Sequence, residues 1–509
     1  MHAADERSVT TLKIPSMLLM RRAGIAVARS AITLAKLHAT HKIILIAGHG
    51  NNGGDICVAA RCLHEDGFNV QVLLTSVPAQ LRGDAHDAWD SMRVAGVPYT
   101  VLASVGSWET PDSVAVDLLG RPCILVDGLL GTGGIGAPTG VAKRAIQWMN
   151  QMRSVARILS ADLPSGMNGE TGAVDGECVR ADMTVTFARP KTCFLNDTTA
   201  LFVGHLSVVD IGIGSNICEI DPYHVPCELI ALPELTPTFP KPAWGAHKGS
   251  LGRVAIIGGS SLYPHAPVLA ALGALKSGAG LVTLCVPPAS ATAAAIWTPE
   301  SILRIGESST DMANMPNFDA ILVGPGLGQS PETIALIEQL LSTRSSKLVI
   351  DADGLYALNQ LRASPSWKPF KDLVLTPHPG EAALLLNSSV DEIQNNRLAA
   401  VRQLADHYQA TVVLKGAGTL VCKPDGVPWL NRTGNPGMAS GGTGDVLAGM
   451  ITALWTQTSD ALLAACTSVW VHGTAGDRAA LSKGQTSLTA TTLATHLPDA
   501  FHVLTTGHY

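Results

Sequence analysis

The chain has 509 residues, of which 46% are hydrophobic and 15% are charged, and its formal net charge is −6. This hydrophobic content excludes an intrinsically disordered chain, and this length predicts two or three domains. The negative charge argues against nucleic acid as the main partner, because phosphate binding requires a basic surface.

The first half of the chain alternates between predicted strands and predicted helices. The expected helices cover 16–37 and 56–66. The expected strands cover 42–47, 70–75, 123–126, 158–161 and 184–187. This alternation predicts a parallel sheet with helices on both faces, in which ligands bind beyond the carboxyl ends of the strands.

A proline-rich stretch interrupts the pattern, and we predict a linker over 218–245 with one short strand at most. Beyond it, strands are expected at 253–258, 281–286, 320–323, 348–350, 373–375 and 411–414, with helices at 268–277 and after Gly444. The two halves share no repeated sequence. We therefore predict two different α/β domains, over 1–217 and 246–509.

No segment is expected to cross a membrane, because glycine, proline and serine clusters interrupt the least charged stretches. The N-terminus has no apolar signal segment. The ten cysteines form no C-x-x-C pair, so reduced thiols in a cytoplasmic protein are expected.

The first glycine-rich loop, GHGNNGGD over 48–55, follows a predicted strand and satisfies G-x-G-x-x-G. Such a loop brings backbone amides and a helix N-terminus toward a phosphate. The dinucleotide-binding version also needs an acid at the end of the next strand. That strand, VQVLLTS, has none, which disfavours a hydride-transferring Rossmann domain. A tight turn without a ligand is the alternative, but the number of Asn, Gly and Asp residues favours ligand binding.

Two further strands of this half end in similar loops, DGLLGTGGIGAP over 127–138 and DLPSGMNGETG over 162–172. The side chains of Asn52, Asp127, Asp162 and Ser165 would form an oxygen-rich cluster at one sheet edge. Oxygen ligands suit an alkali or alkaline-earth cation better than zinc. Each acid taken alone would be interpreted as a helix N-cap, and their recurrence at one edge favours a site.

The strongest signal is the stretch NRTGNPGMASGGTGD over 431–445, which runs into an apolar helical pattern. Gly441, Gly442 and Gly444 leave backbone amides at a helix N-terminus, where they can hold an anion or stabilise a transferring phosphoryl group. Asp445 can accept a proton from a substrate hydroxyl. The alternative is an N-capping aspartate, which does not explain the glycines before it.

Other loops of the second half support a phosphate site. KGAGT places Lys415 beside two glycines, GPGLGQS is a further glycine-rich strand end, DADGL carries two acids, and LTPHPGE carries His378 and Glu381. A lone histidine such as His378 is more often structural, but among these loops it is a candidate for substrate contact. The chain has neither the P-loop motif nor the protein-kinase motifs.

In this order the motifs resemble those of the bifunctional NAD(P)H-hydrate repair enzyme family. GHGNNGGD, DGLLGTG and DLPSGMNGETG resemble its NAD(P)HX epimerase domain. HKGSLGRVAIIGGS, GPGLG, DADGL, LTPHPGE, KGAGT and NPGMASGGTGD resemble its ADP-dependent NAD(P)HX dehydratase domain. The resemblance implies an N-terminal Rossmann-like three-layer sandwich and a C-terminal ribokinase-like α/β domain.

The resemblance also implies a repair activity on hydrated NADH and NADPH. The first domain would interconvert R- and S-NAD(P)HX, and the second would dehydrate the S form with ADP, releasing AMP and phosphate. ADP rather than ATP and a homo-oligomer, of which a tetramer is a plausible form, are implied by the family alone. Mg²⁺ is expected at the second site because a divalent ion screens the nucleotide phosphates. Asp445 and Asp162 are the catalytic candidates. Lys191 is a weaker one, with a solvated surface lysine as the alternative.

The implied site residues divide into four sets. In the first site the hydrate would contact Asn51, Asn52, Gly53, Gly54, Asp55, Gly131, Thr132, Gly133, Gly134, Ile135, Gly136, Ala137 and Asp162. A potassium ion would be held there by Asn52, Asp127 and Ser165. In the second site the hydrate would contact Ala266, Gly326, His378 and Asp445. The nucleotide would be held by Lys415, Gly416, Ala417, Gly418, Thr419 and Gly444.

Three positions depart from the family pattern. Ile56 and His265 stand where the family usually has glycine, and Asn168 stands where an acid is common. Two rival functions remain open from the sequence. The second half could be a small-molecule kinase, and the first half could be a binding module without catalysis.

Overall fold

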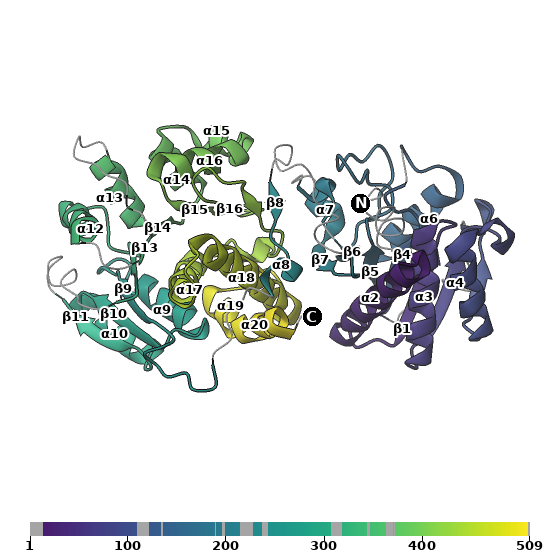
Figure 1. Cartoon of the computed structure of the whole chain (residues 1–509), viewed down its shortest axis with the longest axis horizontal. Coiled ribbons are helices and arrows are strands. Elements are labelled where there is room, and N and C mark those ends of the chain that lie inside the picture. Colours follow the sequence, from purple (N-terminus) through teal and green to yellow (C-terminus); the bar gives the residue numbers. More distant parts are fainter. Residues whose placement is uncertain are drawn as a thin grey trace. The chain divides into compact units, whose positions relative to one another are not determined.

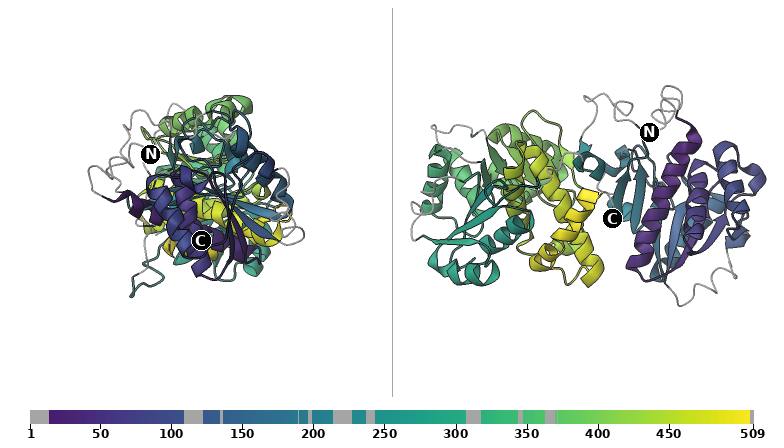
Figure 2. Two further views of the ribbon diagram at one scale, coloured as in Figure 1. Left: turned by 90° about the vertical axis from the view of Figure 1, so that its right-hand side faces the viewer. Right: turned by 60° about the horizontal axis from the view of Figure 1, so that its bottom comes forward.

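The computed structural model describes residues 14–108, 122–133, 136–188, 190–195, 199–213, 227–236, 243–306, 318–343, 347–362, 370 and 372–506. The chain divides into two compact units after residue 223. This division falls inside the predicted linker, whose boundaries at 218 and 245 stay a prediction. The elements of each unit can be followed in Figures 1 and 2.

The first unit is a parallel sheet between two layers of helices. Among its described residues the strand order is β3-β2-β1-β4-β5-β6-β7, and every neighbouring pair is parallel. The strands are β1 Lys42–Ala47, β2 Asn69–Leu74, β3 Tyr99–Val101, β4 Cys123–Gly128, β5 Ala156–Ala161, β6 Met183–Phe187 and β7 His205–Val209. The helices are α2 Ser16–Leu37, α3 Asn51–Glu65, α4 Gly83–Val94, α6 Gly140–Gln151 and α7 Ala200–Val203.

Strand β1 is buried on both of its faces, which explains its uninterrupted apolar sequence. Ile43 and Leu45 enter the hydrophobic core beneath α2, α3 and α4. Ile44 and Ile46 enter a second core beneath α6. Alternate residues of one strand therefore serve opposite layers, and the predicted three-layer sandwich is confirmed.

Helix α3 begins earlier than the sequence predicted. The expected start was near Ile56, but the helix begins at Asn51, after the extended N-cap residue Gly50. The residues NNGGD are therefore the first five residues of the helix and not a loop before it. Two glycines had been interpreted as loop residues because glycine is a weak helix former. They are tolerated here because a side chain at Gly53 would meet Gly48, just beyond β1, and a side chain at Gly54 would meet Met20 on α2.

The second unit contains a larger mixed sheet. Its described strands have the order β11-β10-β9-β12-β13-β14-β15-β16-β17-β8. Pairing is parallel from β11 to β15, antiparallel from β15 to β17, and parallel between β17 and β8. The strands are β8 Glu228–Leu229, β9 Arg253–Ile257, β10 Leu281–Val286, β11 Ile302–Ile305, β12 Ala320–Val323, β13 Lys347–Ile350, β14 Leu373–Leu375, β15 Thr411–Leu414, β16 Leu420–Cys422 and β17 Trp429–Leu430.

Helix α17 lies at the centre of the second unit, against strands β9, β12 and β13 and beside α9 and α18 (Figure 1). The helices are α8 Leu232–Leu235, α9 Ala266–Lys276, α10 Pro288–Trp297, α12 Pro331–Thr343, α13 Asp353–Arg362, α14 Pro379–Leu386, α15 Val390–Asn395, α16 Arg397–Tyr408, α17 Thr443–Gln457, α18 Ala461–Lys483, α19 Ala490–Thr495 and α20 Leu497–Thr506. Strand β8 lies in the predicted linker, which agrees with the prediction of one short strand at most in that segment.

Within the described ranges, no helix is both long enough and apolar enough to span a membrane. The nine cysteines in these ranges are all free thiols. Eight of them are buried, which agrees with the absence of paired cysteine motifs in the sequence.

The close approach of α3 to β1 gives a stability prediction. A methyl group in Gly53→Ala would lie 2.0 Å from the backbone oxygen of Gly48. We expect the free energy of unfolding of the first unit to fall by about 3 kcal/mol, as for an overpacked core. Hydrogen exchange of peptides from β1 measures opening of this unit separately from the second.

The matched control is Gly50→Ala in the same motif. A Cβ at Gly50 meets no atom within 4 Å. Its φ of −92° also suits alanine. This variant should exchange at the wild-type rate, and equal destabilisation by both substitutions would contradict the explanation.

Candidate functional sites

The first site forms where β4 and β5 end, around the fully buried carboxylate of Asp127. One carboxylate oxygen, Oδ1, accepts hydrogen bonds from Ser165 Oγ at 2.6 Å and Leu129 N at 3.2 Å. The other, Oδ2, accepts from Ser160 Oγ and Ser165 N, both at 2.9 Å. Burial raises the pKa of Asp127 above its ordinary value, and these hydrogen bonds offset only part of the rise.

Asn52 reaches the same cluster from the first turn of α3. Its Nδ2 donates to the carbonyl oxygens of Leu130 at 2.9 Å and Ala161 at 3.2 Å. Its Oδ1 is buried and has no hydrogen-bond partner. A buried acceptor left unpaired costs about 1–3 kcal/mol, so a bound cation would relieve a real penalty. The oxygens of Asn52, Ser165 and Leu130 are hard donors that fit such an ion.

Asp162 stands immediately after β5 and forms an ion pair with Lys191. The Lys191 Nζ lies 2.5 Å from Asp162 Oδ1 and also donates to Thr186 Oγ1 at 2.8 Å. Lys191 is only 6% exposed, so the alternative of a solvated surface lysine is wrong. Asp162 has a φ of +66°, a left-handed conformation that is uncommon and costly for residues other than glycine.

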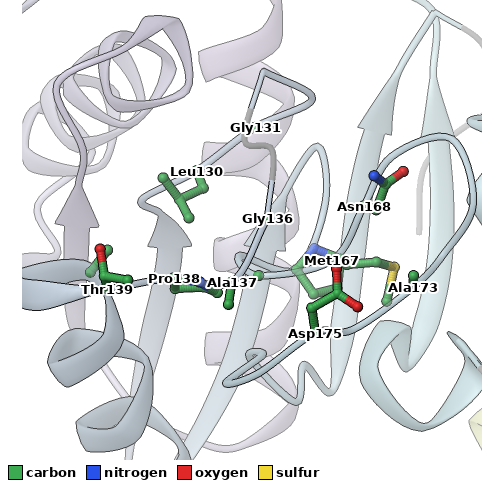
Figure 3. Close-up of a pocket in the computed structure, with 13 residues that line it drawn as sticks. Leu130, Gly131, Gly136, Ala137, Pro138, Thr139, Met167, Asn168, Ala173 and Asp175 are labelled. Atoms are coloured by element: carbon green, nitrogen blue, oxygen red, sulfur yellow. The ribbon is translucent and has the colours of Figure 1, made fainter.

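A pocket of about 220 Å³ lies between the loops that follow β4 and β5 (Figure 3). Its walls include Gly131, Gly136 and Ala137, three of the residues implied to contact the hydrate. Thr132 and Gly133 lie on the same loop, and Gly134 and Ile135 lie outside the described residues. Asn168 also lines the pocket, and its Oδ1 accepts from the backbone amides of Glu170 and Thr171 at 2.9 and 3.0 Å.

The rest of the NNGGD motif divides between surface and core. Asn51 is exposed, whereas Gly53, Gly54 and Asp55 are buried near the start of α3. A Cβ at Gly54 would lie 2.7 Å from the sulfur of Met20. None of these four residues lines the pocket that the structure describes. The two glycines therefore serve close packing of α3, and Asn52 is the motif residue that reaches the cluster around Asp127.

Ile56 fills space beside the cluster. It is fully buried, and a Cβ at Gly128 would lie 2.0 Å from its Cγ1. The glycine next to Asp127 thus leaves room for this larger side chain. The side chain of Ile56, at a position that departs from the family pattern, is accommodated in the space beside Gly128.

The second site forms at the N-terminus of α17. Gly442 is the N-cap, with a φ of +90° that favours glycine. Asp445 follows in the first turn and remains partly exposed. Burial and the nearby charge of Asp351 raise the pKa of Asp445 to about 7, although Lys415 opposes the rise. A carboxylate with this pKa can accept a proton near neutral pH and later return it.

Lys415 connects the acids of the site. Its Nζ lies 2.7 Å from Asp351 Oδ1 and 3.9 Å from Glu381 Oε2. Burial lowers the pKa of Lys415, but the charges of Asp351 and Glu381 outweigh this and leave the pKa raised. A Cβ at Gly444 would lie 3.4 Å from the same Nζ. The strand end that carries KGAGT and the start of α17 therefore meet.

His378 has a structural role at the start of α14. Its Nδ1 accepts from Gly380 N at 3.0 Å and Glu381 N at 3.2 Å, while its own backbone amide donates to Glu381 Oε2 at 2.7 Å. This is a capping box in which histidine replaces the usual hydroxyl residue. More than half of the His378 side chain is exposed, and its Nε2 lies 3.4 Å from Glu381 Oε1, so both ring nitrogens contact the start of α14.

Gly326 and Ala266 lie together at the ends of β12 and α9. Gly326 has a φ of +69°, and a Cβ there would lie 3.1 Å from Ala266 Cβ. His265 is the exposed N-cap of α9, with a φ of −97°. Any residue adopts that conformation, so the replacement of the family's glycine by His265 causes no backbone strain.

The HKGSLG motif lies away from this site. It precedes β9, and Leu251 accepts a hydrogen bond from Thr456 Oγ1 near the end of α17 at 3.3 Å. Helix α17 has 15 residues and separates the motif from the site by about 22 Å. The motif therefore supports the family resemblance without contributing to the site.

Three anchoring side chains were missed by sequence reasoning. Arg397 donates to the carbonyl oxygens of Leu414, Lys415 and Gly418 at 3.1–3.3 Å and holds the KGAGT loop. Asp477 accepts from Gly434 N at 2.9 Å, and the His472 ring lies 2.9 Å from Thr443 O. All three lie on helices without a motif, so only tertiary contacts identify them.

Within the described residues, no group of three or more His, Cys, Asp or Glu side chains is arranged to hold a metal ion. Both sites depend instead on main-chain groups, amide and hydroxyl oxygens and paired charges. A metal at either site would need neutral oxygens or ligand phosphates to complete its coordination.

Both halves of the chain match family models. Residues 254–499 match the model described as NAD(P)H-hydrate dehydratase, and residues 16–193 match the model described as YjeF-related protein N-terminus. A ribokinase-like superfamily protein from Enterococcus faecalis is 27% identical, with a TM-score of 0.50, and the match covers 56% of this chain and 99% of that chain. The predicted ribokinase-like fold of the second half is thereby confirmed.

A second solved structure carries a function in its name. It is the ADP/ATP-dependent NAD(P)H-hydrate dehydratase from Bacillus subtilis, co-crystallised with ATP and Mg²⁺. It is 29% identical, with a TM-score of 0.50, and the match covers 55% of this chain and 99% of that chain.

Two relatives match nearly the whole chain. The bifunctional NAD(P)H-hydrate repair enzyme of Moorella thermoacetica is 36% identical, over 97% of this chain and 94% of its own. The corresponding enzyme of Coxiella burnetii is 35% identical, over 97% and 96%. The chain belongs to the family of bifunctional NAD(P)H-hydrate repair enzymes.

Proposed function

We propose that the second site dehydrates S-NAD(P)HX with ADP and that the first site interconverts the R and S forms of the hydrate. The observation that carries the proposal is Asp445, a carboxylate with a pKa of about 7 at the start of α17, beside Lys415 and the glycine amides. The names of the relatives support the pairing of the two activities on one chain.

Dehydration requires a better leaving group than hydroxide. Asp445 accepts the proton of the ring hydroxyl while the hydroxyl oxygen attacks the terminal phosphoryl group of ADP, and AMP leaves. The carbon–oxygen bond then breaks and releases phosphate. The neighbouring ring carbon then loses a proton to the departing phosphate, which restores the ring double bond of NAD(P)H.

The surrounding groups of the second site are suited to the charge that develops in this transfer. The ammonium group of Lys415 and the amides at the start of α17 would stabilise the negative charge of the transferring phosphoryl group. The site is partly shielded from water, which strengthens this interaction. The roles assigned to Gly416, Ala417, Gly418 and Thr419 rest on their place in the loop that Arg397 anchors. The hydrate contacts assigned to Ala266, Gly326 and His378 rest on the position of these residues at the carboxyl ends of the parallel strands.

The carboxylates of Glu381 and Asp445 fit Mg²⁺, and a bound ion would neutralise nucleotide phosphate charge. The ATP and Mg²⁺ in the name of the Bacillus subtilis structure support a metal–nucleotide complex here. ADP as the donor, rather than ATP, remains a prediction from the family resemblance.

In the first site, Asp162 is proposed as the acid and base for loss and return of the hydroxyl, with Lys191 fixing its orientation. Potassium is proposed at Asn52 Oδ1, Ser165 Oγ and the Leu130 carbonyl oxygen, where it would attract the diphosphate of the hydrate. Asp127 already accepts four hydrogen bonds, so it anchors this cluster and supplies its charge. The homo-oligomer and the cytoplasmic location stay predictions.

The role of Asp445 predicts the pH dependence of dehydration. Only the deprotonated carboxylate accepts the proton, so kcat/KM for S-NADHX should fall about tenfold per pH unit below the pKa of about 7 and level off above it. Asp445→Asn should reduce turnover by at least about 100-fold. Recovery of NADH absorbance, with ADP and Mg²⁺ present, measures both effects.

Asp460→Asn is a matched control, because Asp460 only caps the N-terminus of α18. It should keep the wild-type pH profile. A flat profile in the wild type, or full activity in Asp445→Asn, would refute the assignment. Net phosphorylation of an alcohol with no action on hydrated NADH would instead favour a small-molecule kinase.

The Asp162–Lys191 pair predicts the epimerase phenotype. Asp162→Asn should lower R-to-S interconversion, above the spontaneous rate, by about 100-fold or more, because the proton-transfer group is lost. Lys191→Met should lower it less, because the carboxylate remains but is no longer oriented. Chromatographic separation of the R and S forms over time measures the rate.

Dehydration of purified S-NADHX should be unchanged in both variants. Glu170→Gln, which alters an exposed carboxylate on the same loop, should behave as the wild type. Wild-type interconversion in Asp162→Asn would support a first unit that binds the hydrate without catalysis.

A further inference from the structure

His472 is buried in the interior of α18, where it faces the start of α17. It is 7% exposed, and its Nε2 lies 2.9 Å from the backbone oxygen of Thr443. A carbonyl oxygen only accepts hydrogen bonds, so Nε2 must carry the proton and donate it. Burial lowers the pKa of His472 to about 4, which keeps the ring neutral at physiological pH.

Thr443 is held from two directions. Its hydroxyl donates to the carbonyl oxygens of Met438 and Ser440, both at 3.0 Å, and its own carbonyl oxygen accepts from His472. The first of these contacts joins Thr443 to the glycine-rich loop before α17. The second joins it to a neighbouring helix, so Thr443 cannot rotate independently of either element.

The carbonyl group of Thr443 and the amide group of Gly444 belong to one planar peptide unit. In a trans peptide these two groups point in opposite directions. The hydrogen bond from His472 therefore adds to the helical geometry of α17 in fixing where the Gly444 N–H points. This amide lies in the first turn of α17 and has no acceptor within the helix, so it is available to a ligand.

We propose that His472 is a positioning residue for phosphoryl transfer, which fixes the Thr443–Gly444 peptide so that the Gly444 amide points at the transferring phosphoryl group. This inference rests on the proposed dehydratase function. The residue touches no ligand itself and acts only through the peptide that it holds.

Helix α18 has further contacts that hold the same region. Asp477, five residues beyond His472, accepts from Gly434 N at 2.9 Å and from Asn435 Nδ2 at 3.0 Å. Between them, a Cβ at Gly473 would lie only 2.1 Å from Thr433 Oγ1. The helix therefore lies directly against the NRTGNPG segment, and the His472 contact belongs to a rigid support for this side of the site.

The test compares substitutions that keep or remove the donor to Thr443. His472→Gln places an amide nitrogen near the position of Nε2, whereas His472→Leu has a similar volume and no donor. The control is Ser468→Ala on the same buried face, because Ser468 Oγ donates only to Ala464 O within α18, at 2.8 Å. The kcat for ADP-dependent dehydration of S-NADHX and the calorimetric Kd for ADP are measured for each variant.

We expect His472→Leu to lower kcat about tenfold, less than the loss on removing a transition-state donor outright, because the Gly444 amide is misdirected and not deleted. The Kd for ADP should change by less than about twofold, since an interaction made only in the transition state affects kcat alone. His472→Gln and Ser468→Ala should retain most of the wild-type kcat.

Three results would overturn the inference. The first is a wild-type kcat in His472→Leu, and the second is an equal loss of kcat in the Gln and Leu variants at unchanged thermal stability. The third is a His472→Leu variant that loses affinity for ADP but keeps the wild-type kcat. If His472→Leu does not fold, His472→Asn replaces it, because its amide is one bond too short to reach Thr443. A wild-type enzyme without dehydratase activity would refute the proposed function itself, before any variant is compared.

Discussion

The second unit depends on an ion pair placed where a helix begins. Lys415 lies between the carboxylates of Asp351 and Glu381 and within reach of Asp445, so three acids share one ammonium group. Burial, together with the excess of negative charge around this one ammonium group, raises the pKa of the Asp445 carboxyl to about 7. The same excess of carboxylates suits the binding of a metal–nucleotide complex, because its cation would neutralise part of their negative charge.

The first unit also has a buried carboxylate at the end of a parallel strand, but hydrogen bonds rather than an ion pair stabilise it. Among the residues that the structure describes, Asp127 has no cationic partner, and hydroxyl and amide donors satisfy its buried carboxylate. Asn52 Oδ1 is left unpaired beside this network. Both units place their polar groups at the carboxyl ends of parallel strands, where backbone amides and loop side chains converge. The two sites therefore follow one architectural rule, although their polar groups differ.

The bounds of strands buried on both faces were predicted accurately because each apolar run ends abruptly at polar or glycine residues. The predicted bounds of β1, β10, β12, β14 and β15 agree with the structure. The start of α3 was predicted five residues too late, since glycines that serve close packing look like loop residues in a sequence. Lys191 was undervalued for a related reason. Its burial depends on Asp162, which lies 29 residues earlier in the chain.

The sequence by itself determined the parallel α/β architecture, the glycine-rich strand ends and the identity of Asp445 and Asp162 as candidates, because periodicity and local motifs are properties of neighbouring residues. Only the tertiary structure decided which charges are paired, which amides are held and which carboxyl has a pKa of about 7. Those properties depend on contacts between distant segments, such as His472 with Thr443 and Arg397 with the loop after β15. A sequence pattern contains no distance between such residues, and the fold alone brings them together.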